Sequence, residues 1–285
     1  NLNLPLPFPD AMQEFKVETS PRGAKQGGKS SGSVSLVTKS GTNDFHGNLF
    51  EFVRNGMFNA RNAFAAKRDT MKRNQLGGTI GGPIFKNKLF FFAGLQVTRI
   101  RQDPPETFAY VPTAAMIAGD VRSFASAPCN SGRQINLSAP FVNNQVNPAL
   151  FSSPAVKFSS FLPKTEDPCG KVYYSDPFND DWKNGIGRVD YQLSNNHSLF
   201  GRYLRESRHQ PVGYDLTGNL LSAGNGIEGL NQALTIGSTY LFGPNVVNTF
   251  RATYNDFNGG KTGADFSKCN CGMGRLGINS YFPRP

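Results

Sequence analysis

The residues from Gly23 to Ser30 have the spacing of a phosphate-binding loop. They read GAKQGGKS and match GxxxxGK[ST], in which backbone amides and a lysine surround the phosphates of a nucleotide. That chemistry needs a helix directly after the loop, because the helix N-terminus supplies amide groups and a dipole. The next residues, SGSVSLV, are β-branched or small and predict a strand instead. We therefore expect neither a nucleotide nor another cofactor here.

The cysteines indicate disulfides rather than a metal site. Two of them form CxC, not the CxxC of zinc sites, and the three histidines are scattered along the chain, so no metal ligands are expected. Loop disulfides in an oxidising compartment fit better. The first choice pairs the two cysteines that share one long loop, and unpaired thiols are the alternative. The possible disulfide residues are Cys129, Cys169, Cys269 and Cys271.

No set of residues predicts catalysis. No Ser/His/Asp combination stands out, and His46 and His197 flank expected strands as ordinary polar positions. The glycine-rich run from Gly77 to Gly82 lacks the GxGxxG spacing of dinucleotide-binding proteins. We expect the chain not to be an enzyme and to contain no catalytic residues.

The positive charge is concentrated near the start of the chain. Residues 1–101 hold 15 Lys and Arg against 6 Asp and Glu, whereas the remainder holds 15 against 14. Such a basic third could face nucleic acid, anionic lipid or an anionic ligand, or could be an ordinary solvated surface. The block Phe90–Phe92 at a strand end fits an aromatic girdle better than a base-stacking platform, which needs spaced aromatics.

The rest of the sequence predicts many strands joined by turns. Long helices are disfavoured by 31 Gly and 19 Pro, and no apolar run reaches the ~20 residues of a membrane-spanning helix. Short turns and long loops alternate, which is typical of a meander that crosses a membrane. Long loops are expected near 102–183 and 207–230, with short helices near 113–119 and 154–161 in the first. Expected strands are 33–39, 46–54, 89–101, 187–193, 198–206, 232–241 and 246–256.

Polar and apolar residues alternate within most of these strands, so each strand has two distinct faces. In 187–193 the polar face carries Arg188 and Asp190, opposite Val189 and Tyr191, and in 246–256 it carries Arg251. In a membrane barrel these polar positions would face the lumen. They could touch a ligand or form internal salt bridges that hold the wall, and the second reading is favoured.

Four stretches of the sequence resemble Oar-like TonB-dependent receptors of the kind common in Acidobacteria. The stretch at 28–55, GKSSGSVSLVTKSGTNDFHGNLFEFVRN, is similar to their junction of plug and barrel. RNQLGGTIGGPIFKNKLFFFAGLQVTR at 73–99 resembles the next hairpin, and NGIGRVDYQLSNNHSLFGRYLRES at 184–207 resembles a later one. AYVPTAAMIAGDVRSF at 109–124 looks like an extracellular loop segment. Together they cover most of residues 10–257.

The resemblance implies an all-β fold, a partial antiparallel transmembrane β-barrel with about seven strands of a 22-strand type. Residues 1–40 would be the C-terminal end of a plug domain, and 41–285 the N-terminal part of the barrel. The chain does not begin with Met or a signal peptide, so a fragment of a longer protein is expected.

The implied function is energised uptake of an unknown extracellular ligand across the outer membrane of a Gram-negative bacterium, without covalent chemistry. The implied partners are the TonB complex, through segments outside this chain, and outer-membrane lipid or lipopolysaccharide, with no nucleic acid. Two alternatives remain: an outer-membrane adhesion or matrix-organising barrel without transport, and a soluble nucleic-acid-binding β-protein.

Overall fold

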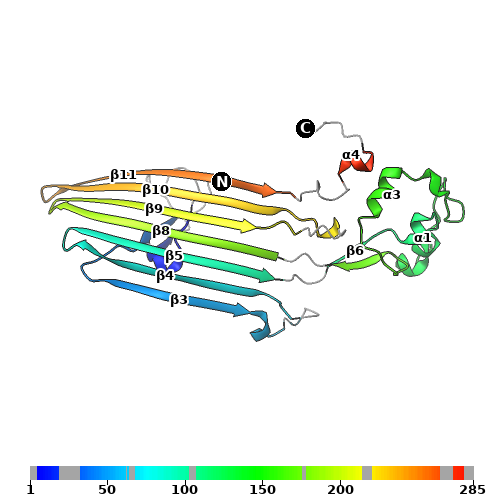
Figure 1. Cartoon of the computed structure of the whole chain (residues 1–285), viewed down its shortest axis with the longest axis horizontal. Helices are drawn as coiled ribbons and strands as arrows, with labels where there is room; N and C mark the ends of the chain where they lie inside the picture. Colours follow the sequence, from blue (N-terminus) through cyan, green and yellow to red (C-terminus); the bar gives the residue numbers. More distant parts are fainter. Residues whose placement is uncertain are drawn as a thin grey trace.

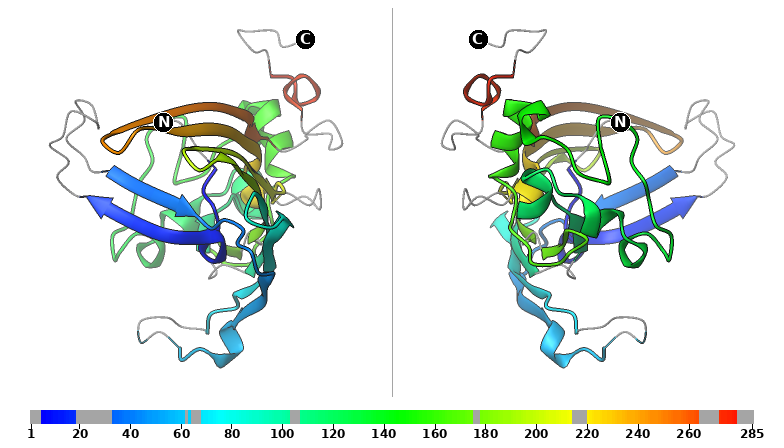
Figure 2. Two further views of the ribbon diagram at one scale, coloured as in Figure 1. Left: turned by 90° about the vertical axis from the view of Figure 1, so that its left-hand side faces the viewer. Right: turned by 90° about the vertical axis from the view of Figure 1, so that its right-hand side faces the viewer.

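The fold is a large curved antiparallel sheet with a hairpin on one face and a small folded unit at one end (Figures 1 and 2). The computed structural model describes residues 5–18, 33–61, 63, 68–102, 107–174, 178–213, 220–263 and 272–278. The phosphate-loop lookalike at 23–30, as well as Cys269 and Cys271, lies outside these residues.

Seven strands form the main sheet in the order β11-β10-β9-β8-β5-β4-β3, and the sheet does not close. The short turns β4–β5, β8–β9 and β10–β11 lie at one end, and the long connections leave from the other (Figure 1). The expected meander is therefore confirmed. The strands are β3 (His46–Asn55), β4 (Lys72–Phe85), β5 (Leu89–Gln102), β8 (Phe178–Ser194), β9 (His197–Gln210), β10 (Gly226–Phe242) and β11 (Val246–Thr262).

The three strands that border the long loops, β8, β9 and β10, extend further than the sequence predicted, so both loop boundaries need correction. The expected loop at 102–183 ends where β8 begins at Phe178, and the one at 207–230 spans only the residues between Gln210 and Gly226. The added segments mix polar and apolar residues on the same face, as with Asp180, Trp182 and Asn184 in β8, which removes the alternation that marks a strand in the sequence. They are held by their neighbours: Asp181 pairs with His209 across β8 and β9.

The glycine-rich run forms the middle of β4, where side chains from other segments come close. A Cβ at Gly77 would collide with the Phe50 ring of β3. On the neighbouring strand, a Cβ at Gly94 would lie 2.8 Å from Cζ of Phe8 in the N-terminal segment. The absence of a side chain at these positions lets another element pack directly on the sheet.

The remaining elements lie around the sheet. The N-terminal segment, residues 5–18 and 33–40, pairs two antiparallel strands in a hairpin on the concave side of the sheet (Figure 2). Its elements are η1 (Pro9–Ala11), β1 (Met12–Glu18) and β2 (Ser33–Thr38). Short elements outside the sheet are η3 (Gly56–Phe58), η6 (Leu220–Ser222) and α4 (Met273–Leu276).

Residues 107–174 form a separate small structure, the loop unit, between β5 and β8 (Figure 1). Its two end strands pair antiparallel, and a disulfide joins Cys129 to Cys169, the pair that the sequence analysis put first. The helices expected near 113–119 and 154–161 are present as α1 and α3. The elements are β6 (Thr107–Tyr110), α1 (Ala114–Ile117), α2 (Arg122–Ala125), η4 (Ala127–Cys129), η5 (Pro148–Leu150), α3 (Ser153–Ser159) and β7 (Lys171–Tyr174).

Removing the disulfide should destabilise the loop unit by about 3–4 kcal/mol, because the bond closes a loop of 40 residues. In the full-length protein, we expect the Cys129→Ser/Cys169→Ser variant to be cut by protease within 107–174, while the strands stay protected. Equal protease resistance of the variant and the wild type would show that packing alone holds the unit.

An ion pair in the loop unit gives a pH prediction. The Arg122 side chain donates to the Asp120 carboxylate and lowers the pKa of that group to about 2, against an ordinary value near 3.8. Because the folded-state pKa is depressed, the pair favours the folded unit at neutral pH, and the effect is lost as pH falls from 3.8 towards 2. NMR should place the Asp120 titration near pH 2, and Arg122→Gln should raise its midpoint.

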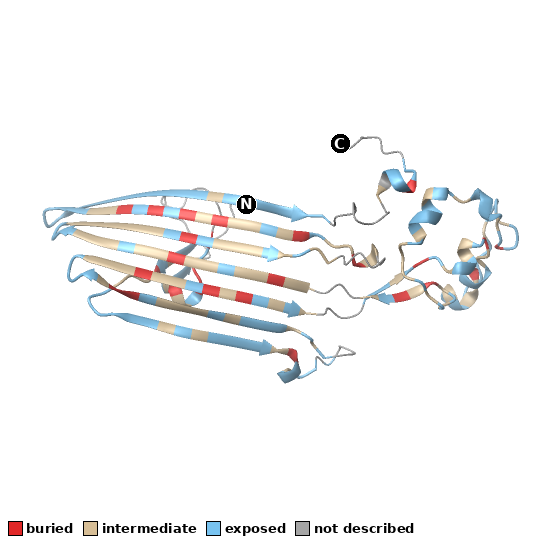
Figure 3. Ribbon diagram, viewed as in Figure 1, coloured by how far each residue is buried: buried red, intermediate tan, exposed pale blue. Residues whose placement is uncertain are grey.

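The two faces of the main sheet differ in polarity. Ladder register assigns alternate residues to the convex outer face, where large apolar side chains are exposed, including Leu49 at 91% and Tyr254 at 69%. Figure 3 shows the buried residues spread along the strands as short bands rather than in one closed core. Exposed apolar area on this scale requires an apolar environment. Other exposed outer residues are Val53, Leu76, Ile80, Leu95, Val189, Leu193, Tyr203, Leu234, Ile236, Tyr240 and Phe250.

Candidate functional site: the inner face of the sheet

The concave inner face is lined largely by polar and charged side chains from four adjacent strands. Register places them in rows: Asn184 is opposite Glu206, and Arg188 is opposite Arg202. A polar interior beneath an apolar exterior is the reverse of a soluble sandwich and is typical of membrane barrels. The inner positions include Asp180, Asn184, Arg188, Asp190, Arg202, Glu206, Arg208, Asn231, Thr235, Arg251, Thr253 and Asn255.

The N-terminal segment is anchored on this face by a small apolar contact. Phe8 and Ala11 are buried in one cluster with Phe92 and Ile186 of the sheet. The Phe8 ring also lies 6.1 Å from that of Phe50. This cluster is the principal core of the described chain, so the segment and the sheet stabilise one another.

Polar contacts hold the same segment at two further points. Asn48 of β3 donates a 2.7 Å hydrogen bond to the Asp10 carboxylate. On β8, Arg188 donates from Nη1 to the backbone oxygen and to Oγ1 of Thr38, both at 3.0 Å. Each contact joins a sheet residue to a residue far away in sequence, and together they fix how the segment lies in the concavity.

The structure places all three residues predicted to be lumen-facing on the inner face. Arg188 and Asp190 form an ion pair of 2.7 Å, and the Arg188 guanidinium lies 5.1 Å from the centre of the Phe200 ring. This is the internal salt bridge that the sequence reading favoured. Arg251 shares the face but is on β11, and the structure gives it no ion pair with a described carboxylate.

Arg202 also faces inward, although the sequence analysis did not single it out. It lies directly opposite Arg188, and its Nη2 is 3.5 Å from Thr235 Oγ1. Its Nε is buried without a hydrogen-bond partner. The alternation GRYLRE could have revealed it, because Arg202 has the polar parity of its strand. Its placement brings a second guanidinium next to the one that holds Thr38.

Two further polar networks brace the wall towards the long-loop end. Glu206 accepts hydrogen bonds from Asn184 at 2.9 Å and from Asn231 at 3.1 Å, which ties three strands together. Arg208 binds the buried Asp180 carboxylate at 2.9 Å and lies 4.7 Å from the Trp182 ring centre. These contacts pair the charged groups with one another inside the wall, so we assign them to wall rigidity rather than to ligand binding. Only Oδ1 of Asn231 in these networks is buried without a hydrogen-bond partner among the described residues.

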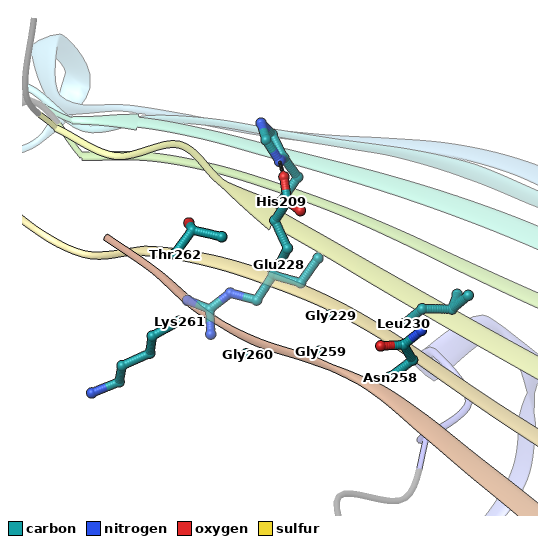
Figure 4. Close-up of a pocket in the computed structure, with 10 residues that line it drawn as sticks. His209, Glu228, Gly229, Leu230, Asn258, Gly259, Gly260, Lys261 and Thr262 are labelled. Carbon is teal, nitrogen blue, oxygen red and sulfur yellow. Dashed lines mark ion pairs between the residues drawn. The ribbon is translucent and has the colours of Figure 1, made fainter. Parts of the chain in front are cut away.

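An open hollow of about 460 Å³ lies at the long-loop end of β9–β11 (Figure 4). Gly229, Gly259 and Gly260 contribute no side chains to its wall, while His209 and Glu228 form an ion pair of 3.2 Å at its margin. Lys261 adds positive charge, whereas the Arg208 guanidinium, which also lines the hollow, is already paired with Asp180. The hollow could accept a small polar or anionic group.

Other kinds of site are not found in the described part of the chain. There, no group of three or more His, Cys, Asp and Glu side chains could hold a metal ion. None of the helices described is long and apolar enough to cross a membrane.

Comparison with known proteins agrees with this geometry. The family described as outer membrane beta barrel domain matches residues 37–284. The TonB-dependent transporter Oar of Myxococcus xanthus is 31% identical over 91 residues, covering 29% of this chain and 9% of that protein. No solved structure matches. The polar inner face, the exposed apolar outer face and the family match lead to one conclusion: the chain belongs to the outer membrane beta barrel family and resides in the bacterial outer membrane.

Proposed function

We propose that this chain is part of an Oar-like TonB-dependent transporter that takes up an extracellular ligand with energy supplied through the TonB complex. In this proposal the N-terminal segment is the end of a plug, and the main sheet is the first third of the barrel wall. The transport step moves a solute and involves no covalent chemistry, so no catalytic residue is assigned.

The observation that supports the proposal most directly is that the N-terminal segment packs against the concave inner face of the main sheet. A plug must close the lumen at rest and release part of its contacts when pulled. The contacts fit that requirement, since they combine one small apolar cluster around Phe8 with a few hydrogen bonds to Asp10 and Thr38. Contacts of this kind can break and re-form without unfolding the barrel wall.

Uptake can be tested without knowing the ligand. Cells that contain the full-length gene, cells that lack it and protonophore-treated cells would grow in the same complex medium, and mass spectrometry would follow each dissolved compound. We expect at least one compound to be consumed only by untreated cells with the gene. If all three cultures deplete the same compounds, the transport proposal fails.

Movement of the segment gives a second readout. Ala11 is fully buried in the contact with the sheet, so a cysteine there should resist a maleimide reagent at rest. In energised cells that are taking up the compound, we expect Ala11→Cys to be labelled at least several-fold faster, with mass spectrometry locating the label. If the labelling rate of Ala11→Cys is the same with and without the protonophore, the result would contradict pulling of the segment by TonB.

A second candidate, surface adhesion without transport, is favoured by the loop unit. Its paired end strands β6 and β7 expose Phe108, Tyr110 and Tyr173, and Lys171 lies 4.5 Å above the Phe108 ring. Exposed aromatics beside a cation form a contact surface for another molecule. If adhesion is the function, Phe108→Ala/Tyr173→Ala should reduce attachment of cells to matrix, while depletion of dissolved compounds stays unchanged.

A further inference from the structure

Three arginines occupy neighbouring positions on the inner face of the sheet, and we call Arg188, Arg202 and Arg251 the inner arginine cluster. Arg202 of β9 is directly opposite Arg188 of β8 and Thr235 of β10. Thr253 of β11 continues this row, and Arg251 lies two residues away on the same face. Like charges directly opposite each other on a sheet, as for Arg188 and Arg202, are unfavourable unless a counter-charge compensates them.

Two members of the cluster lack a counter-charge in the described part of the chain. On the inner face of β8–β11, the carboxylates of Asp180, Asp190 and Glu206 are each engaged by other side chains. No described carboxylate forms an ion pair with Arg202 or Arg251. The Nε of Arg202 is also buried without a hydrogen-bond partner among these residues. The two arginines therefore offer donors and positive charge to a group that comes from outside the described chain.

The cluster lies at the height of the apolar band of the outer face. The exposed outer residues Val189, Tyr203 and Ile236 each directly follow an inner residue of the same row in sequence. Guanidinium groups at this depth in a membrane must be solvated or paired from the lumen. In membrane pores, arginine and lysine side chains that line the passage select anions and phosphate. The position therefore favours a site for a solute inside the barrel.

We propose that the inner arginine cluster binds the oxyanion of a solute in the lumen, either a carboxylate or a phosphate group. A guanidinium group presents parallel N–H donors that fit two oxygens of such a group. Arg202 and Arg251 are the main ligands, because Arg188 is already paired with Asp190. The site rests on the proposed function for the origin of the solute, but binding itself requires no energy from TonB.

An aromatic ring and two hydroxyl groups lie within the same part of the wall. The Phe200 ring covers Gly237, because a Cβ at this glycine would collide with the ring, and Gly237 is the residue opposite Arg251. The hydroxyl oxygens of Thr235 and Thr253 are 3.2 Å apart in the row that leads from β9 to β11. The arginines are thus accompanied by a flat apolar surface and by neutral hydrogen-bonding groups, which leaves their charge for the anion.

The site borders the N-terminal segment. Arg188 donates to the backbone oxygen and to Oγ1 of Thr38, both at 3.0 Å. Leu204, two residues from Arg202 on the same face, is buried in one cluster with Phe8. A solute bound by Arg202 would therefore lie where the N-terminal segment meets the wall.

The test follows the reactivity of single arginines in the full-length protein purified in detergent. Phenylglyoxal modifies accessible guanidinium groups, and peptide mass spectrometry measures the rate at each arginine. The probes are inorganic phosphate, acetate and, at equal ionic strength, chloride. At about ten times the half-protecting concentration, phosphate or acetate should slow labelling of Arg202 and Arg251 about tenfold, because an occupied site does not react. Protection by only one of the two probes identifies the group that is bound.

A variant tests whether the two arginines share one anion. Arg202→Gln should raise the anion concentration that half-protects Arg251 about tenfold or more, because a charged hydrogen-bonding partner is lost. The matched control is Arg205→Gln, on the outer face of the same strand, which should leave that concentration unchanged. In the wild type, Arg205 itself should react at the same rate with and without each probe.

Several results would overturn the site: equal protection by chloride, no protection by phosphate or acetate, or an unchanged half-protecting concentration in Arg202→Gln. If neither Arg202 nor Arg251 reacts without a probe, another part of the full-length chain occupies them, which also refutes the assignment. The first two results come from the wild type and do not depend on whether the variant folds. Protection without energised uptake would refute only the transport proposal, whereas uptake without protection would refute only this site.

Discussion

Replacing Ile236 with arginine should destabilise the protein in a lipid bilayer by about 2–4 kcal/mol, the cost of a cation near the middle of the apolar band. Ile236 is 52% exposed, so a soluble protein would tolerate this change with little effect. Its neighbours on the outer face of β9 and β11 are Gly201 and Ala252, which offer no counter-charge. Urea unfolding of the full-length protein in lipid vesicles, read by tryptophan fluorescence, measures the loss.

Leu230→Arg is the matched control for this prediction. Leu230 lies on the same strand and the same face, about 20 Å closer to the long-loop end, with Ser207 and Asn258 beside it. A cation at the membrane interface costs only about 0–1 kcal/mol. If both variants lose equally little stability, the outer face is in water and the membrane placement of the sheet is wrong. If only Ile236→Arg destabilises the protein, Ile236 lies within the apolar part of the bilayer and Leu230 lies at its interface.

The polarity of the two faces could be predicted from the sequence because it is a local signal. In β8, Arg188 and Asp190 alternate with Val189 and Tyr191, and a period of two is enough to separate inner from outer positions. The same reasoning placed Arg251 correctly on the inner face. The short turns were equally readable, since each depends only on a few consecutive residues, whereas the bounds of both long loops were not.

The contacts between strands could not be predicted in the same way. Arg202 is important only because the pairing register of β8 and β9 brings it opposite Arg188. The sequence of either strand alone does not determine this register. Thr38 and Arg188 are 150 residues apart in sequence, and their hydrogen bonds depend on the seat of the N-terminal segment. The start of β8 was missed because polar Asp180 and Asn184 share one face with apolar Trp182, so no alternation marks the strand, and neighbouring strands pair it. The local pattern of residues thus predicts the strands and the polarity of their faces. The contacts between strands, and those between the sheet and the N-terminal segment, depend on tertiary pairing.

The largest loss of stability among inner-face variants should come from Arg208→Met, at about 3–5 kcal/mol. Asp180 is only 3% exposed, and Arg208 gives it hydrogen bonds of 2.9, 3.0 and 3.2 Å. Methionine keeps a side chain of similar length but removes the guanidinium, together with its contact with the Trp182 ring, and leaves a buried carboxylate without its partner. Urea unfolding in vesicles should show this loss, and Asp180→Asn in the same chain should restore a large part of it, because the amide carries no charge to desolvate.

Arg101→Met tests whether burial is the cause. Arg101 and Asp181 form an ion pair of similar length, 2.8 Å, on the adjacent strand pair, but their side chains are 44% and 32% exposed. Water can solvate Asp181 when its partner is removed, so the expected cost is at most about 1 kcal/mol. Equal losses for Arg101→Met and Arg208→Met would mean that packing of the arginine stem, not desolvation of the carboxylate, sets the stability of the wall. A much larger loss for Arg208→Met would show that the buried ion pair between Arg208 and Asp180 stabilises the wall mainly through its charges.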